Sequence, residues 1–222
     1  NLNRNFLRVK SREVIFQLKK IGINTNLLIN TSSRMENARK VLNDVAKDAS
    51  KQFLTLKKWG DVEVTKDIFL LFREDTILRI LAGIIQGISG SIYRPRYLDL
   101  LNFAKAISDK KFKARTLSGV LARAVTKEKI VLRREPSFPK FVSNLTSKKL
   151  IWDGRWEISV SRNLKKHEKI GPLGNKGYQQ LKKHVLNSDY VEGLLTTPTL
   201  FSRDTVISSP ILKYGDILTC KL

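Results

Sequence analysis

The sequence predicts an α+β fold, in which an N-terminal helical part is followed by a C-terminal mixed α+β domain with a small, mostly antiparallel sheet. Apolar residues recur at three- and four-residue steps through the first half of the 222-residue chain, which is the helical period. Beyond about residue 110 the period changes to the alternation of apolar and polar residues that is typical of strands. We therefore expect two domains, residues 1–112 and residues 113–222.

Four helical segments are expected in the first part. Asn3 or Asn5 can cap a helix that runs to about Lys20 and ends at Gly22. A second helix is expected over about 26–58, because a single apolar stripe runs along it: Leu28, Met35, Ala38, Leu42, Val45, Ala49 and Phe53. "DVEVT" is then a short strand or an extended link. A helical stretch follows over 66–88 with a break near Arg73, and Pro95 is expected at the first position of the next helix.

Short strands are expected in the second part, where "ARTLSGVLARAV" and "KIVLRREP" should pair as a hairpin. A helix is expected over 178–185, and "TPTLF", "TVISS" and "ILTCKL" should be short closing strands.

The stretch "LIWDGRWEISV", residues 150–160, allows two interpretations. Asp-Gly is the usual two-residue hairpin turn. However, Trp152, Trp156, Ile158 and Val160 fall on one face with an intact period of two, which favours one strand running through. We predict the single strand, with Trp152 and Trp156 in the core. Gly154 would then mark a bulge or a close backbone approach, and Arg155 would form a structural ion pair.

The chain carries a formal net charge of +22 and has a pI of about 10.2. Such an excess requires an anionic partner, either nucleic acid or an acidic membrane surface. The charge is densest over residues 111–149, with 11 basic and 2 acidic residues. We favour nucleic acid over the membrane, because the apolar stripes look core-facing and no strongly basic amphipathic helix stands out.

Several classes of chemistry find no support in the sequence. The single cysteine, Cys220, excludes a disulfide framework and fits a reducing, cytoplasmic compartment. No apolar run is long enough to span a membrane, and no cysteine pair exists for a zinc site. "GPLGNKG" lacks the spacing of a phosphate loop. We expect neither a catalytic residue nor a metal site in this chain.

Because the chain begins at Asn and its only methionine is Met35, we also expect it to be part of a longer polypeptide.

Arginines are the main candidates for contacts to RNA or a nucleotide, because the guanidinium group binds phosphate in a bidentate manner. Arg94 and Arg96 surround an expected helix N-terminus, which also favours anions. For "FLRVKSR" near the start, a solvated helix and a phosphate contact are both open. The candidate residues are Arg8, Lys10, Arg12, Arg94, Arg96, Arg115, Arg123, Arg133 and Arg134.

Six motifs in order resemble the bacterial tRNA(Ile)-lysidine synthases, most closely the alphaproteobacterial members. "NRNFLRVKSRE" is similar to the segment that leaves the family's catalytic domain, with matches at Phe6, Arg8 and Arg12 and with Lys10 in place of an arginine. "GISGSIYRPRYLDLL" resembles the family's helix entry, with Ser89 in place of a glycine. "ARTLSGVLARA…IVLRREP" resembles its hairpin, and "LIWDGRWEI" its Leu-Trp-Asp-Gly-Arg-Phe strand, with Trp156 in the Phe place. "GPLGNKGYQQL" and "TPTLF…SPILKYGD" also match.

The resemblance implies a place in an ATP-dependent ligase. In this family ATP, with Mg, is bound by an N-terminal ATP-pyrophosphatase domain whose Ser-Gly-Gly-x-Asp-Ser loop does not occur in this sequence. The wobble cytidine of tRNA(Ile) with a CAU anticodon is adenylated, and free lysine then displaces AMP. The product, lysidine, changes decoding from AUG to AUA. The implied role of this chain is to bind and position the tRNA, without catalytic competence of its own.

One alternative stays open from the sequence alone. A stand-alone, non-catalytic basic RNA-binding protein, the remnant of a split gene, would have the same charge and the same lack of a nucleotide site. A homodimer is also left open.

Overall fold

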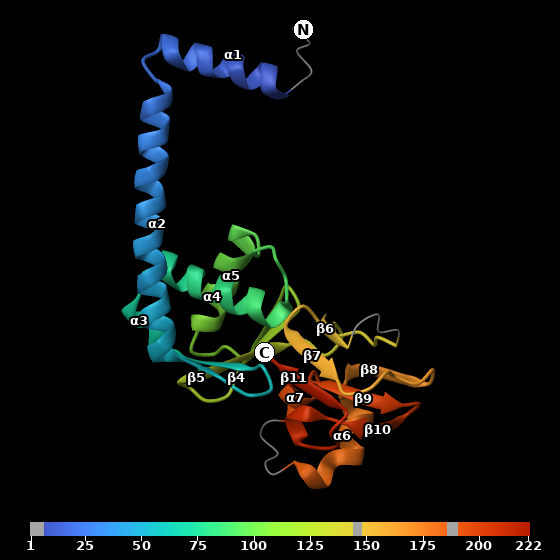
Figure 1. The fold of residues 1–222 in the computed structure, drawn as a ribbon. Helices are drawn as coiled ribbons and strands as arrows, with labels where there is room; N and C mark the ends of the chain where they lie inside the picture. The colour runs from blue at the N-terminus through green and yellow to red at the C-terminus, as the bar shows by residue number, and fades with distance from the viewer. Residues whose placement is uncertain (1–6, 144–147, 186–190) are drawn as a thin grey trace. The chain divides into compact units, whose positions relative to one another are not determined.

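The computed structural model describes residues 7–143, 148–185 and 191–222, and it confirms the α+β class (Figure 1). The chain forms two compact units, Asn1–Val45 and Ala46–Leu222. The first unit consists of α1 (Leu7–Lys20) and most of α2 (Thr25–Phe53), whose last residues belong to the second unit. The expected caps Asn3 and Asn5, and Phe6 of the first motif, lie outside the described residues.

The helices of the first unit begin and end where local signals direct. Gly22 follows α1 with φ +86°, as expected for a helix terminator. The Asn24 Oδ1 atom accepts a hydrogen bond of 2.9 Å from the backbone N–H of Leu27 at the start of α2. The described side chains of this unit are largely exposed. Of the stripe predicted for α2, only Ala49 is buried, while Phe53 packs against the core of the second unit.

A five-stranded antiparallel sheet organises the start of the second unit. Its spatial order is β1 (Leu54–Leu56), β2 (Val62–Thr65), β5 (Lys129–Arg134), β4 (Val120–Ala124) and β3 (Ala114–Leu117). The predicted boundary between residues 112 and 113 is therefore wrong, because it would cut this sheet between β2 and β5. "DVEVT" is a strand whose pairing, Val64 opposite Ile130, joins distant parts of the sequence.

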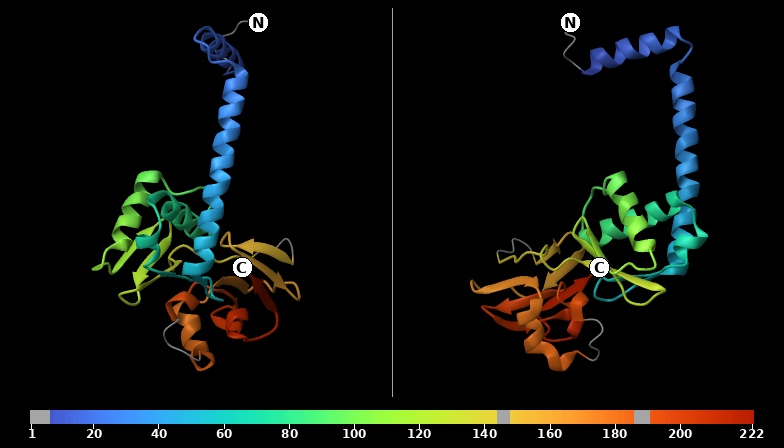
Figure 2. Two further views of the ribbon diagram at one scale, coloured as in Figure 1. Left: turned by 90° about the vertical axis from the view of Figure 1, so that its left-hand side faces the viewer. Right: turned by 180° about the vertical axis from the view of Figure 1, so that it is seen from behind.

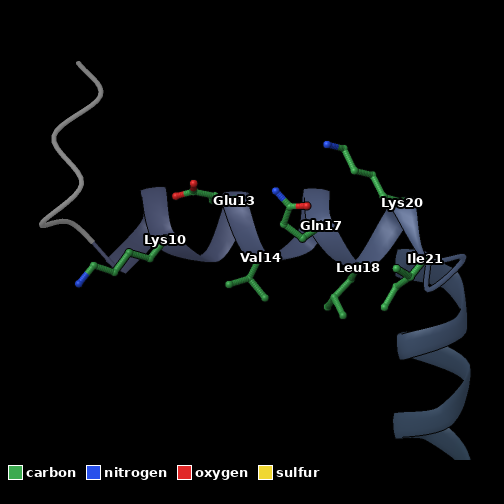
Figure 3. A pocket seen from close by; sticks show the side chains of 7 residues that line it. All are labelled: Lys10, Glu13, Val14, Gln17, Leu18, Lys20 and Ile21. Carbon is green, nitrogen blue, oxygen red and sulfur yellow. The ribbon is translucent and has the colours of Figure 1, made fainter.

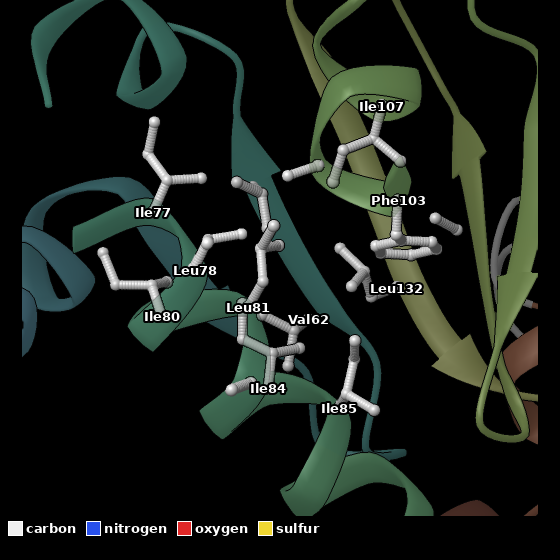
Figure 4. Packing of buried hydrophobic residues seen from close by; sticks show 14 of the residues in the cluster. Val62, Ile77, Leu78, Ile80, Leu81, Ile84, Ile85, Phe103, Ile107 and Leu132 are labelled. Carbon is white, nitrogen blue, oxygen red and sulfur yellow. The ribbon is translucent and has the colours of Figure 1, made fainter. Parts of the chain in front are cut away.

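Helices cover one face of this sheet. They are α3 (Ile68–Leu71), α4 (Glu74–Ser89) and α5 (Tyr97–Ser108). Side chains of α4 and α5, such as Leu81, Ile85 and Phe103, meet Leu132 of β5 in the main core (Figure 4). The break predicted near Arg73 is confirmed, since Arg73 is the extended residue that precedes α4. Pro95 lies two residues before the predicted position, because Arg96 is the N-cap of α5 and Tyr97 is its first residue.

Two three-stranded antiparallel sheets share the second core. One has the order β11 (Leu218–Lys221), β7 (Trp156–Val160) and β6 (Lys149–Trp152), and the other β10 (Thr205–Ser208), β9 (Pro198–Ser202) and β8 (Glu168–Pro172). The three predicted closing strands are thus confirmed. Trp156 and Ile158 of the first sheet pack with Ile170 and Leu200 of the second.

Helices also cover the sheet β10–β9–β8. α6 (Gly174–Leu181) and α7 (Val191–Leu194) contribute Leu181 and Leu194 to a third cluster, together with Leu173, the N-cap of α6, and with Phe201 and Val206. Figure 2 shows the orange and red ribbon of this part of the chain from two further sides. Short 3-10 helices follow at Lys182–His184 and Pro210–Leu212. No described helix has both the length and the apolar character needed to cross a membrane.

The prediction of one strand over residues 150–160 is wrong. β6 and β7 form a hairpin in which Trp152 lies opposite Trp156. Asp153 and Gly154 form its turn with φ of +52° and +68°, and the N–H of Arg155 donates to the carbonyl of Trp152 at 3.3 Å. Two positive φ values mark the turn type that Asp-Gly favours. The predicted burial of both tryptophans is confirmed.

The segment "ARTLSGVLARAV" contains a turn that was not predicted. The sequence predicts this run as one half of a hairpin, yet it folds as two strands, β3 and β4, joined by Ser118 and Gly119 at φ +50° and +75°. The predicted hairpin with "KIVLRREP" is also present, as β4 and β5.

Candidate nucleic-acid interface

Three predicted contact residues are exposed on the second unit and have no counter-ion in the part of the chain that the structure describes. Arg94 lies in the link between α4 and α5, Arg96 caps α5, and Arg115 lies on the edge strand β3. Within the described part of the chain, none of these guanidinium groups makes a hydrogen bond or an ion pair. They are therefore available to an external anion, and their charge is not offset locally.

Three further candidates lie on α1. Arg8, Lys10 and Arg12 are exposed there. Because the segment is helical, Arg8 and Arg12 share a face while Lys10 lies on the other side. In an extended segment the three basic side chains would line one side, but this helix does not place them in such a row.

An open groove of about 710 Å³ follows α1 and the turn after it. In Figure 3 its apolar side chains Val14, Leu18 and Ile21 point to one side of the helix, while Glu13 and Lys20 point to the other. The helix is thus amphipathic, with its apolar face open.

Arg133 is buried rather than exposed. Its Nη1 donates to Glu192 Oε2 at 2.5 Å, and its Nη2 lies 3.2 Å from Asp61 Oδ2. Glu192 also accepts from Arg123 Nη1 at 2.6 Å, and this pair is half exposed. These four side chains therefore connect β5 and β4 with the loop before β2 and with α7.

Arg134 is buried on the opposite face of β5. Its Nε and Nη2 donate to the two carboxylate oxygens of Asp153 at 3.0 and 2.7 Å, and its Nη1 donates to the carbonyl of Gly119 at 3.2 Å. Arg155 Nε donates to the same carboxylate at 2.9 Å, which confirms the predicted structural ion pair. The side chains of Arg134, Asp153 and Arg155 are only 8%, 4% and 2% exposed.

The burial of Arg133 and Arg134 contradicts their prediction as RNA contacts. Adjacent residues of a strand point to opposite faces, so both faces of the end of β5 are covered, and each arginine already has a carboxylate partner. This end of β5 therefore joins the five-stranded sheet to the rest of the second unit. Arg123 is paired but half exposed, so its contact with RNA stays a prediction.

The turn at Asp153–Gly154 also lies against the end of α4. A Cβ atom at Gly154 would lie 2.6 Å from the carbonyl oxygen of Gly90, and one at Gly90 would lie 2.4 Å from that of Asp153. Real Cβ atoms do not approach so closely. Of the alternatives given for Gly154, the structure shows the close approach of a neighbouring backbone, although at a turn and not within one strand. The contact fixes the start of the link that carries Arg94.

Asp61 gives this part of the fold a dependence on pH. Burial raises the pKa of Asp61 from 3.8 to about 6. Arg133, Trp59 and Arg155 oppose this shift because they favour the charged form, whereas the negative charge of Glu192 adds to it. A carboxyl group with a raised pKa binds its proton more tightly in the folded state, so its contribution to stability is present below pH 4 and is lost as the pH rises through 6.

We therefore expect the wild type to lose stability relative to Asp61→Asn between pH 4 and pH 6.5, by about 2–3 kcal/mol. Urea unfolding of both proteins across this range measures the difference. Parallel pH profiles for the two proteins would contradict the assignment.

Sequence reasoning missed two groups of residues. Two of the carboxylates that hold the buried arginines, Asp61 and Glu192, carry no pattern that marks them, whereas Asp153 belongs to the Asp-Gly-Arg that the sequence singles out. Tyr93 and Tyr97, which are exposed beside Arg94 and Arg96, were recognisable as aromatic residues interleaved with arginines in "YRPRY". Among the described residues, no group of three or more His, Cys, Asp or Glu side chains is arranged to hold a metal ion.

Comparison with known proteins adds no assignment. No family model matches the chain, and no curated protein matches it.

Proposed function

We propose that this chain is the tRNA-binding portion of a tRNA(Ile)-lysidine synthase. The observation that carries the RNA-binding part is the set of exposed arginines that have no counter-ion among the described residues, Arg94, Arg96 and Arg115, on a chain of net charge +22. The family part rests on the order of the six motifs along the sequence. Of the residues in those motifs, the Asp-Gly-Arg of 153–155 has a structural role, which is compatible with its recurrence in the family.

In this proposal the chain binds tRNA(Ile) with a CAU anticodon and performs no chemistry. ATP and Mg, together with free lysine, belong to the family's catalytic domain, which this sequence does not contain. The exposed arginines bind backbone phosphates, and the residues around them determine which RNA is accepted. The buried arginines Arg133, Arg134 and Arg155 hold the structural parts of the second unit together, and their charge does not reach the RNA.

We expect the double variant Arg94→Gln/Arg96→Gln to bind tRNA(Ile) about tenfold more weakly, because charge-assisted contacts to phosphate are lost. The slope of log K against log salt should become shallower by about 1 for each arginine, because fewer counterions are released. A salt titration of binding by fluorescence anisotropy measures both quantities.

Arg162→Gln is the matched control. Arg162 donates two hydrogen bonds of 2.7 Å to Glu168, which already offsets its charge. This variant should leave the salt slope unchanged. The proposed interface would be wrong if the double variant kept the wild-type slope, or if both variants reduced the slope equally.

A further inference from the structure

The link between α4 and α5, together with the first turn of α5, exposes a group of large side chains. Ile92 is 89% exposed, Tyr93 83%, Tyr97 61% and Leu98 67%. Single exposed apolar residues are ordinary in soluble proteins, but four within seven residues form a local patch. Their exposure indicates that something other than the core of this unit binds them.

The backbone that carries the patch is fixed by hydrogen bonds. Gln86 Nε2 donates to the carbonyl of Ile92 at 2.9 Å. The hydroxyl of Ser91 donates to the carbonyl of Tyr93 at 3.1 Å and accepts from the N–H of Tyr93 at 3.2 Å. The link starts at Gly90, which is held against the Asp153–Gly154 turn. The side chains are therefore presented on an ordered segment, which reduces the entropy lost on binding.

The patch combines aromatic rings with cations. Tyr93 and Tyr97 flank Arg94 and Arg96, whose guanidinium groups have no partner among the described residues. The hydroxyl of Tyr97 donates to Glu74 Oε1 at 3.3 Å, and the charge of Glu74 raises the pKa of Tyr97.

This combination fits unpaired nucleotides better than it fits a duplex. Aromatic side chains stack on the faces of unpaired bases, while nearby cations bind the phosphates. In a duplex the base faces are already stacked on each other, and recognition depends on backbone and groove contacts. An acidic lipid surface would also accept cations and apolar residues, but two exposed aromatic rings on either side of two arginines offer stacking faces for bases together with cations for the adjoining phosphates.

We propose that Tyr93 and Tyr97 bind unpaired RNA bases by stacking, and that Arg94 and Arg96 bind the phosphates of the same strand. The inference deepens the proposed function and rests on it for the identity of the polyanion as RNA. It assigns the α4–α5 link to single-stranded segments of the RNA rather than to its helical stems.

Two probes test this with the full chain: a short single-stranded RNA that carries 2-aminopurine, whose fluorescence reports stacking, and a blunt-ended RNA duplex. Tyr93→Ala and Tyr97→Ala should each weaken binding of the single strand by at least about fivefold and relieve the quenching of 2-aminopurine. Tyr93→Phe and Tyr97→Phe, which keep the ring, should bind within about twofold of the wild type. Duplex affinity should be unchanged in all four variants.

Leu70→Ala is the control for loss of an exposed apolar side chain, since Leu70 is 85% exposed on α3. It should affect neither probe. The inference would be overturned if the Phe variants lost as much affinity as the Ala variants. It would also be overturned if duplex and single-strand affinity fell together, or if the tyrosines bound vesicles of anionic lipid but not the single strand.

The two proposals fail separately. If the tyrosines bind the single strand but the chain does not prefer tRNA(Ile), the proposed function is wrong and the stacking assignment stands. If the chain prefers tRNA(Ile) and the Ala variants bind the single strand normally, only the stacking assignment is wrong.

Discussion

Replacing Asp153 by asparagine is expected to lower the free energy of unfolding by about 3–5 kcal/mol, the cost of removing one partner from a buried charge group. The carboxylate of Asp153 accepts hydrogen bonds from both Arg134 and Arg155, and all three side chains are buried. Without the negative charge, two guanidinium groups would remain close together in a medium that solvates them poorly. Burial already lowers the pKa of Arg155, and Asp153 opposes that shift.

The substitution by asparagine removes the negative charge of residue 153 and leaves the backbone conformation of the turn unchanged. Asp153 has φ +52°, a conformation that asparagine tolerates well. The control is Asp204→Asn, which makes the same change at an exposed turn position beside Arg203 and should change stability by less than about 0.5 kcal/mol. Chemical denaturation of both variants measures the difference. If both variants changed stability equally and only slightly, the positive charges of Arg134 and Arg155 would not depend on the carboxylate of Asp153.

Replacing Gly154 by alanine should also destabilise the second unit, by about 2–5 kcal/mol. Two costs add at this position. The residue has φ +68°, which disfavours any side chain, and a Cβ atom would lie 2.6 Å from the carbonyl oxygen of Gly90 and 2.9 Å from its Cα. Relief of that contact requires the hairpin β6–β7 and the end of α4 to move apart.

Two other glycines separate these costs. Gly174 has φ +59° but open space around its Cα, so Gly174→Ala measures backbone strain alone, about 1–2 kcal/mol. Gly87 lies within α4 with open space and an ordinary φ, so Gly87→Ala should stabilise by about 0.5–1 kcal/mol. Thermal unfolding of the three variants gives the order. If Gly154→Ala cost no more than Gly174→Ala, the contact with Gly90 would be unimportant.

The helices were predictable because their signals are local. The stripe from Leu28 to Phe53 and the terminator Gly22 gave α1 and α2 to within a few residues, and the break near Arg73 separated α3 from α4. The domain boundary failed for the opposite reason. β2 has only four residues, and its position in the sheet depends on pairing with β5. This pairing joins segments far apart in the sequence, so no local pattern predicts it.

The hairpin at residues 150–160 shows why periodicity can mislead. Trp152 and Trp156 lie opposite each other, and cross-strand partners point to the same face of a sheet. Their separation of four residues is even, so the alternation continues through the turn as it would along one strand. In this case the Asp-Gly pair was the informative signal, and the unbroken period was compatible with both structures.

The candidate site was predicted in part. Residue type alone cannot separate an exposed arginine from a buried one: Arg94 and Arg96 are free of partners in the described chain, whereas Arg133 and Arg134 meet carboxylates 59 and 19 residues away. A cluster of charge along the sequence therefore overstates the surface that it offers to RNA. Part of the densest basic segment holds the fold together.

The most direct measurement is competition for labelled tRNA(Ile) with a CAU anticodon, at fixed salt, between the unlabelled tRNA and an unrelated RNA duplex of the same length. The proposed function predicts that the tRNA competes at least about tenfold better, a difference of about 1.4 kcal/mol. Equal competition would contradict it and would leave a basic protein that binds RNA without regard to its identity.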